Sequence, residues 1–186
     1  PGNDYTGAVS TDHEGNIYLS STVKSGAPTT LGVHQTYFGG GTYDAMISKF
    51  DKSGKLVLST YFGGSGYDDN FTKLKILSDG AIVISGSTNS PNQIATTGAH
   101  DTTLGGGYDV FVAVFEPDGK LRWSTYFGGS ADDFQFGIAV DNDDNIYLTG
   151  STLSSTGIAT TGSFQPMRAG AQDGFFAKFD KTGSLQ

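Results

Sequence analysis

The sequence contains no cysteine, no long hydrophobic segment and few basic residues, and each absence excludes a class of protein. Without cysteine among its 186 residues, the chain has neither disulfides nor thiolate metal sites, although an exported protein remains allowed. No stretch approaches the roughly 20 apolar residues that span a bilayer, so membrane insertion is not expected. The 11 basic residues against 19 acidic ones give a net charge of -8, which disfavours nucleic acid as a partner.

Glycine and aromatic residues are abundant instead. The 28 Gly, 13 Phe and 9 Tyr suit many short strands joined by tight turns. The same composition argues against a helical bundle.

A segment is repeated three times along the chain. The hexapeptide STYFGG occurs at 59–64 and again at 124–129. Asp109 in YDVFVAVF follows Asp44 in YDAMISKF by 65 residues, and it precedes Asp173 in QDGFFAKF by 64. A fixed period of this kind is typical of propellers and solenoids. We therefore expect three units, at residues 1–64, 65–128 and 129–186.

Each unit contains four short strand patterns rich in Ile, Val, Phe, Tyr and Thr. In the third unit they cover 136–141, 146–152 and 174–180, followed by the short segment SLQ. The second unit completes the fourth pattern as KLRWSTYFGG. Asp, Asn and Gly residues between the patterns indicate hairpin turns. The sequence thus predicts an all-β β-propeller with three four-stranded antiparallel blades, the outer strand of the third being truncated.

The order of these motifs resembles the SBBP-type bacterial β-propeller repeat. The resemblance rests on STYFGGSADDFQFGIAVDNDDNIYLTGST, TTGSFQ and DGFFAKFDKTGSLQ, and it extends over essentially the whole chain. It implies bacterial proteins that are secreted or exposed at the cell surface, with such repeats in series. The resemblance implies no catalytic residues.

Three blades are too few to close a ring, because closed propellers typically have 4–8. We expect these blades to belong to a larger propeller of six to eight blades, with further blades beyond the two ends of this sequence. The alternative is that two copies meet as a six-bladed ring. The expected partners are therefore other blades of the same or a second chain.

The loops of a propeller alternate between two faces. Here one face has hairpin turns, and the other has loops of about 20 residues, such as 89–108 and 153–172, which exceed ordinary hairpin lengths. We expect any ligand to bind this long-loop face. Its most regular polar residues are aspartates, and the candidates are Asp68, Asp69, Asp109, Asp132, Asp133 and Asp173.

The aspartates have two interpretations. Carboxylates could bind Ca²⁺, for which Asp69, Asp109, Asp133 and Asp173 are the candidates. Alternatively, each could accept hydrogen bonds from nearby backbone amides. Recurrence in every unit favours the structural interpretation, so neither a metal nor another cofactor is expected, and calcium stays open as the alternative.

Histidines and aromatic residues at matching positions indicate packing. His34 and His100 correspond to Phe164 in the third unit, and a position that accepts Phe is suited to packing. The aromatic residues of STYFGG would fill the space between neighbouring sheets rather than stack on sugars.

No set of catalytic residues emerges from the sequence, so an enzyme is not expected. No G-x-S-x-G elbow is present, and the Gly-rich FGGSG lacks the Lys of a phosphate-binding loop. Near-identical blades also argue against an active site at a central channel. The sequence favours an extracellular or cell-surface module with a structural, adhesive or protein-binding role. The alternative is a carbohydrate-binding propeller that uses the long loops, so a surface protein or a glycan is the expected ligand.

Overall fold

The described part of the protein consists of three antiparallel β-sheets and contains no helix. The computed structural model describes residues 3–186, and it describes all of their side chains except those of residues 69–71. The described residues contain no helix with the length and apolar character that crossing a membrane would need. The strands are β1 (Tyr5–Thr11), β2 (Ile17–Val23), β3 (Asp44–Phe50) and β4 (Leu56–Phe62) in the first sheet; β5 (Asp68–Ile76), β6 (Ile82–Thr88), β7 (Asp109–Phe115) and β8 (Leu121–Phe127) in the second; and β9 (Asp133–Val140), β10 (Ile146–Thr152) and β11 (Asp173–Phe179) in the third.

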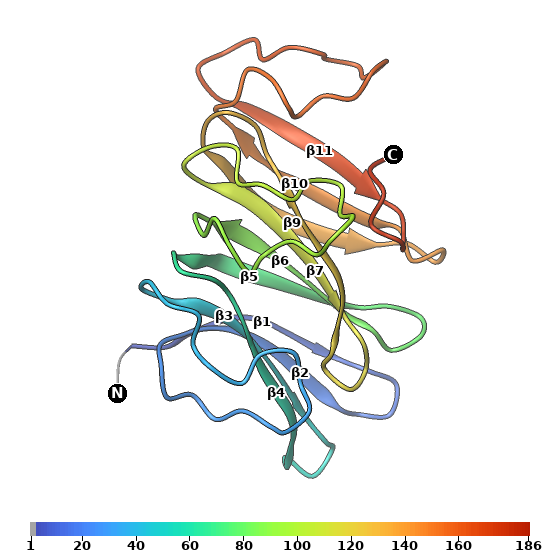
Figure 1. Ribbon diagram of the computed structural model, residues 1–186. Coiled ribbons are helices and arrows are strands. Elements are labelled where there is room, and N and C mark those ends of the chain that lie inside the picture. The colour runs from blue at the N-terminus through green and yellow to red at the C-terminus, as the bar shows by residue number, and fades with distance from the viewer. Residues whose placement is uncertain (1–2) are drawn as a thin grey trace.

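The sheets follow one another as the blades of an open propeller. Within each sheet, strands that are consecutive in the sequence are neighbours. The first strands β1, β5 and β9 contact each other from blade to blade, so they form the inner side of the arc. The blades lie in chain order from the blue to the red end of Figure 1 and do not close into a ring.

Hairpin turns with a repeated aspartate connect the strands. The carboxylate of Asp12 accepts hydrogen bonds from the backbone N–H of Asn16 at 2.9 Å and from the Tyr18 hydroxyl at 3.0 Å. Asp141 accepts the same two bonds from Asn145 and Tyr147, at 2.9 and 2.7 Å. Short polar side chains that bind the backbone a few residues later stabilise such turns.

The core lies between the blades rather than within one sheet. Phe62 of blade one packs against Phe111 and Phe115 of blade two, with ring centroids 5.2 and 5.7 Å apart. At the next junction Phe127 packs against Phe175 and Phe179, at 5.3 and 5.8 Å. The phenylalanines of STYFGG therefore fill the space between neighbouring sheets, as the sequence predicts, whereas Tyr61 packs with Val23 and Met46 of its own blade.

The first strand of blade three differs from its prediction. In blade three we expected this strand to begin at Phe136, but β9 begins at Asp133. A register shift opposite Thr149 and Gly150 interrupts the alternation of side chains, and residues 133–135 resume pairing beyond it. Register shifts also occur in the β1–β2 and β5–β6 pairs. A bulge breaks the period-two pattern on which strand prediction depends, because it adds an unpaired residue.

The third blade has three strands and the beginning of a fourth. Leu185 forms an antiparallel bridge with Phe179, and the backbone N–H of Gln186 donates to the Lys178 carbonyl at 2.9 Å. This agrees with the truncated outer strand that the sequence predicts.

Close packing explains why the first glycine of the GG pair in STYFGG recurs. A Cβ at Gly63 would lie 2.5 Å from Cγ of Asp44, and a Cβ at Gly128 would lie 2.5 Å from Cγ of Asp109. Both aspartates are completely buried, so neither can move away into solvent. Only glycine fits at the end of the fourth strand when this carboxylate lies beside it.

We predict that Gly128→Ala destabilises the protein by about 1–3 kcal/mol, the usual cost of forcing atoms into a packed site. The matched control is Gly174→Ala, where the nearest atom to the new Cβ would be the Gly150 carbonyl oxygen at 3.8 Å. Urea denaturation would measure both variants. Equal midpoints for the two would contradict the steric explanation.

Candidate functional site

The aspartates that begin the third strands bind the end of each long loop. The Asp44 carboxylate accepts a hydrogen bond from the Gly39 N–H at 2.6 Å. Asp109 accepts from the Gly105 N–H at 2.8 Å. Asp173 accepts in the same way from Ala169 N–H at 2.7 Å and Gly170 N–H at 3.1 Å. The same contact therefore fixes the loop in all three blades, as the structural interpretation of the aspartates predicts.

The aspartates that begin the first strands bind the link between blades. Asp68 accepts hydrogen bonds from the Gly64 N–H and the Ser90 hydroxyl, both at 2.7 Å. Asp133 accepts from the Gly129 N–H at 2.7 Å and the Ser154 hydroxyl at 2.8 Å. Each carboxylate thus joins its link to the loop that follows the second strand of its own blade.

The two Asp-Asp pairs in the sequence are not structurally equivalent. Asp68 and Asp133 both begin a first strand, so Asp132 occupies the position of Tyr67 and precedes its strand. Asp132 accepts a hydrogen bond from the Tyr108 N–H at 3.0 Å. The side chain of Asp69 lies outside the described residues.

Burial raises the pKa of two carboxyl groups that begin third strands, those of Asp44 and Asp109. It raises the pKa of Asp44 to about 7, with a further contribution from the charge of Asp68, although the Gly39 amide opposes the shift. It raises the pKa of Asp109 to about 6, opposed by the amides of Gly105 and Gly106. The pKa of Asp173, which lies near the surface, is lowered instead, chiefly by the Ala169 amide. A carboxylate in low dielectric without a cation beside it favours its neutral form.

A row of tyrosines lies next to these aspartates on the long-loop face. Ring centroids are 5.8 Å apart between Tyr43 and Tyr67, 6.4 Å between Tyr67 and Tyr108, and 5.6 Å between Tyr108 and Phe134. Tyr5 extends the row, with its ring 5.9 Å from that of Tyr43. We call these five residues the aromatic row. It crosses both blade junctions, and its rings are half-buried or exposed.

Backbone hydrogen bonds between neighbouring blades hold the row in place. The Asp68 N–H donates to the Tyr43 carbonyl at 2.8 Å, and the Asp133 N–H donates to the Tyr108 carbonyl at 2.7 Å. Sequence reasoning did not find the row, although one signal was present. Tyr43, Tyr67 and Tyr108 each precede one of the buried aspartates.

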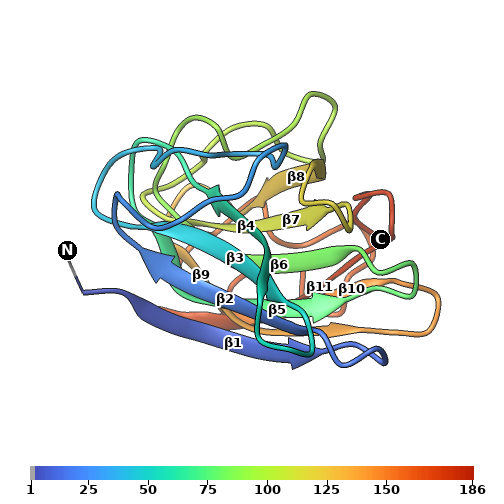
Figure 2. The same cartoon turned by 90° about the horizontal axis from the view of Figure 1, so that it is seen from below.

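The long loops cover the outer edges of the fourth strands. In the loop at 24–43, the N–H of Thr30 donates to the Ser59 carbonyl, and the N–H of Tyr61 donates to the Gln35 carbonyl, both at 3.0 Å. In the loop at 89–108, Thr96 donates to the Ser124 carbonyl at 2.9 Å. Both loops lie at the top of Figure 2. They therefore protect sheet edges, a function that the sequence did not reveal.

The histidines of these loops pack at the blade junctions. The ring of His34 lies 6.2 Å from that of Phe62 and 6.0 Å from that of Phe115, and burial lowers the His34 pKa. His100 lies in the same way against Phe127 and Phe179, at 6.4 and 5.8 Å. This is the packing role that the sequence predicts.

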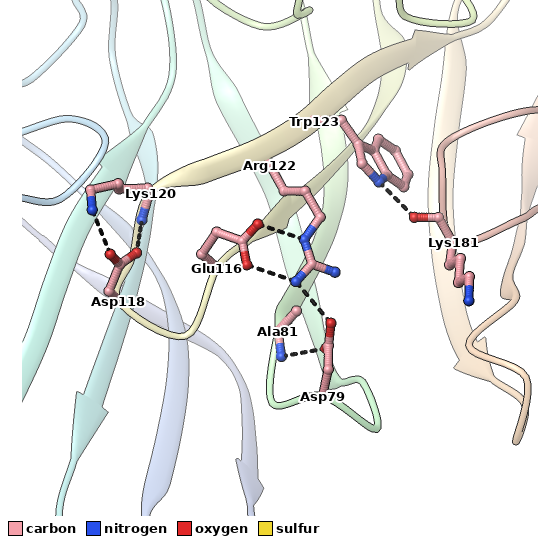
Figure 3. A network of polar contacts seen from close by, with 8 residues as sticks. All are labelled: Asp79, Ala81, Glu116, Asp118, Lys120, Arg122, Trp123 and Lys181. Carbon is pink, nitrogen blue, oxygen red and sulfur yellow. Dashed lines mark hydrogen bonds and ion pairs between the residues drawn. The ribbon is translucent and has the colours of Figure 1, made fainter.

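The opposite face, which carries the hairpins, has its own polar network. Figure 3 shows the Arg122 guanidinium between Glu116 and Asp79, with N–O distances of 2.7 and 2.8 Å. The Trp123 indole N–H donates to the Lys181 carbonyl at 3.1 Å and so joins blade two to blade three. These contacts connect hairpins to one another, and the two-pronged Arg–Glu contact is the strongest kind of surface ion pair.

Comparison with known families agrees with this architecture. Residues 122–158 match the SBBP family model, described as a beta-propeller repeat. The match runs from β8 across the link to β9 and β10, and so includes the junction residues Gly128 and Asp133. It confirms the resemblance to the SBBP repeat. No curated protein matches the chain.

The described residues do not assemble the candidate aspartates into a metal centre. Within residues 3–186, leaving aside the side chains of 69–71, no three or more His, Asp or Glu residues form a group that could hold a metal ion. Asp109 and Asp133 direct oxygens at backbone amides, which occupy positions that a cation would need. Ligand binding by the six candidate aspartates stays a prediction, as does the role of calcium.

We predict that adding Ca²⁺ or EDTA changes the melting temperature by less than about 1 °C. A cation bound only to the folded state would shift it by several degrees at saturating concentration. Differential scanning calorimetry would measure the change at about 5 mM Ca²⁺ or EDTA, a concentration that saturates most calcium sites. A large fall with EDTA that Ca²⁺ reverses would establish calcium binding instead.

We also predict that stability falls as the pH rises from about 4 to about 7. The folded-state pKa values of Asp44 and Asp109 lie above that of an unfolded Asp, so the folded state binds more protons in this window. Each carboxylate contributes a slope of up to about 1.4 kcal/mol per pH unit. Urea unfolding across this range should show a flatter profile for the double variant Asp44→Asn/Asp109→Asn. Asp4→Asn/Asp143→Asn, which removes two exposed carboxylates, controls for the change in net charge; if the double variant at Asp44 and Asp109 kept the wild-type slope, the assignment would be wrong.

Proposed function

We propose that the chain is a non-catalytic binding module of an exported bacterial protein, acting at the cell surface or outside the cell. Its role is structural or adhesive, through contact with another surface protein. The match to the SBBP beta-propeller repeat supports the repeat architecture. The proposal of export depends on the resemblance to bacterial repeats of this type.

The observation that carries the binding role is the aromatic row. Its rings meet edge to face at Tyr43–Tyr67 and Tyr67–Tyr108 and are tilted at Tyr108–Phe134. They cross two blade junctions, so they form an extended surface rather than a pocket. Tyrosine suits such a surface because it offers apolar area and a hydroxyl with few rotatable bonds. The ammonium of Lys24 lies 4.9 Å from the Tyr43 ring centroid and adds a charged group beside the row.

The junction carboxylates support a non-catalytic role. A raised pKa in a cleft is a common sign of an acid or base, but buried structural networks shift pKa values as well. Asp44 and Asp109 are completely buried, and they accept hydrogen bonds from loop amides in equivalent positions. Catalysis requires different groups converging on one point, whereas these junctions repeat the same groups.

A carbohydrate ligand is the alternative that the aromatic row also favours, since sugar rings stack on exposed aromatic side chains. The edge-to-face arrangement argues for protein contact, because neighbouring rings at 81° and 77° do not present one continuous flat platform. The two ligand classes are distinguishable by direct binding measurements.

We predict that the labelled protein binds immobilised bacterial surface proteins. The double variant Tyr67→Ala/Tyr108→Ala should weaken this binding by at least about tenfold, because it removes two central aromatic anchors. The matched control is Tyr37→Ala, which removes an equally large side chain that is 60% exposed and outside the row. A parallel glycan array tests the alternative. Reproducible binding to one sugar with none to protein would favour the carbohydrate alternative, and failure of both with a folded protein would contradict the proposal.

A further inference from the structure

The junction between blades two and three has a carboxylate where the junction between blades one and two has a tyrosine. Asp132 directly precedes β9, just as Tyr67 directly precedes β5. The Asp132 Oδ1 accepts the Tyr108 N–H at 3.0 Å. Among the described residues, no donor or cation contacts its Oδ2, and the side chain is only half-buried. A negative charge without a counter-charge therefore lies next to Tyr108 of the aromatic row.

Blade one shows how a ring of this row holds a cation. Lys24 directly follows β2, and its ammonium lies 4.9 Å from the centroid of the Tyr43 ring. A cation at such a distance is attracted by the negative face of the ring. Tyr43 and Tyr108 are equivalent, because each directly precedes the third strand of its blade. The repeat therefore predicts a cation over Tyr108 as well.

The chain does not supply that cation in blade two. Asn89 directly follows β6 and so takes the place of Lys24, and its side-chain oxygen accepts the Tyr67 N–H at 2.6 Å. None of the residues that the structure describes places a lysine or arginine over the Tyr108 ring. Blade two thus keeps the ring and gains a carboxylate beside it, without the cation that blade one provides.

These differences separate the site from the repeated framework. A structural requirement recurs with the blade, whereas the change from Tyr67 to Asp132 and the change from Lys24 to Asn89 each affect one unit relative to another. Both changes favour a cation that comes from outside the chain. The net charge of -8 also attracts a basic partner over longer distances.

We propose that Tyr108 and Asp132 bind an arginine side chain of the partner protein. This inference rests on the proposed function, in which the aromatic row contacts another surface protein, and it specifies the chemistry of that partner. The guanidinium lies on the Tyr108 ring and donates to the Asp132 Oδ2. Arginine suits this pair because its flat, weakly hydrated group stacks on aromatic rings and also forms directed hydrogen bonds with carboxylates.

The rings on either side of Tyr108 provide apolar surface for the rest of the arginine. The Tyr67 and Phe134 centroids lie 6.4 and 5.6 Å from that of Tyr108. A long basic side chain can pack its alkyl stem on such surface while its charged end stays at a polar group. A partly buried ion pair is also screened less by salt than an open one.

The test is an NMR titration of the isotope-labelled protein with the acetylated and amidated peptide GSRSRSG. The backbone N–H signal of Tyr108 should shift to saturation, because this N–H is bonded to the Asp132 carboxylate. The uncharged peptide GSQSQSG should leave the signal in place. Binding should weaken at least about threefold when NaCl rises from about 20 to about 300 mM, because salt screens the attraction. Equal shifts with both peptides, or none with either, would overturn the proposal.

Two variants of equal net charge separate this site from general attraction. Asp132→Asn keeps an oxygen for the Tyr108 N–H but removes the charge, so it should weaken binding of GSRSRSG at least about threefold, as expected for a partly exposed ion pair. Asp143→Asn removes an exposed carboxylate from the hairpin between β9 and β10 and should change the affinity less than about 1.5-fold. Equal weakening by the two variants would contradict a specific site.

The outcome is separable from that of the proposed function. If Tyr67→Ala/Tyr108→Ala weakens binding to surface proteins while Asp132→Asn does not, the row binds protein without an arginine at Asp132, and only this inference is wrong. If GSRSRSG binds at Tyr108 but no surface protein binds, the arginine site is confirmed and the proposed function fails.

Discussion

A buried aspartate at the start of the third strand, in blades one and two, is the constraint on which the architecture depends. Its carboxylate must find hydrogen-bond donors inside the protein, because burying an unsatisfied carboxylate is costly. The amides at the end of the long loop supply them, as between Gly105 and Asp109. The same carboxylate leaves room only for glycine at Gly128, where the chain leaves the blade. One side chain thus fixes the end of the loop, the exit of the fourth strand and the start of the next blade.

The surface available for binding follows from this junction. The backbone of Tyr108 accepts a hydrogen bond from Asp133 of the next blade, which directs the tyrosine ring outward beside the junction. Most of the polar groups beneath form structural hydrogen bonds, although one carboxylate oxygen each of Asp44 and Asp133 has no partner among the described residues. The aromatic rings therefore provide much of the chemistry left for a partner. The candidate aspartates of the sequence analysis instead stabilise the backbone that lies beneath this surface.

The sequence predicts the repeat, the strands and the core well, because these depend on local patterns. STYFGG and IYLTGST carry both the β-strand alternation and the aromatic packing, and Phe62 and Phe127 lie where the repeat places them. The bulge in β9 was missed because an inserted residue breaks that alternation. The different positions of Asp132 and Asp133 could not be predicted, because two adjacent aspartates look alike until the register shows which of them begins β9.

Tertiary arrangements were less accessible from the sequence. The loop at 24–43 has no strand periodicity, yet it pairs with β4 through isolated hydrogen bonds from residues such as Thr30. The aromatic row brings together Tyr43 and Tyr67, which belong to different blades. Only the position of one sheet against the next creates it.

The two ends of the arc are chemically different, and this gives the molecule a direction. Blade one presents Tyr5, Val9 and Ile17 outward, whereas blade three presents Phe176, which is 68% exposed. A contact between the blade-one end of one copy and the blade-three end of another would join two different surfaces and would be head-to-tail, a geometry that produces a closed ring where the rotation permits and an open filament where it does not.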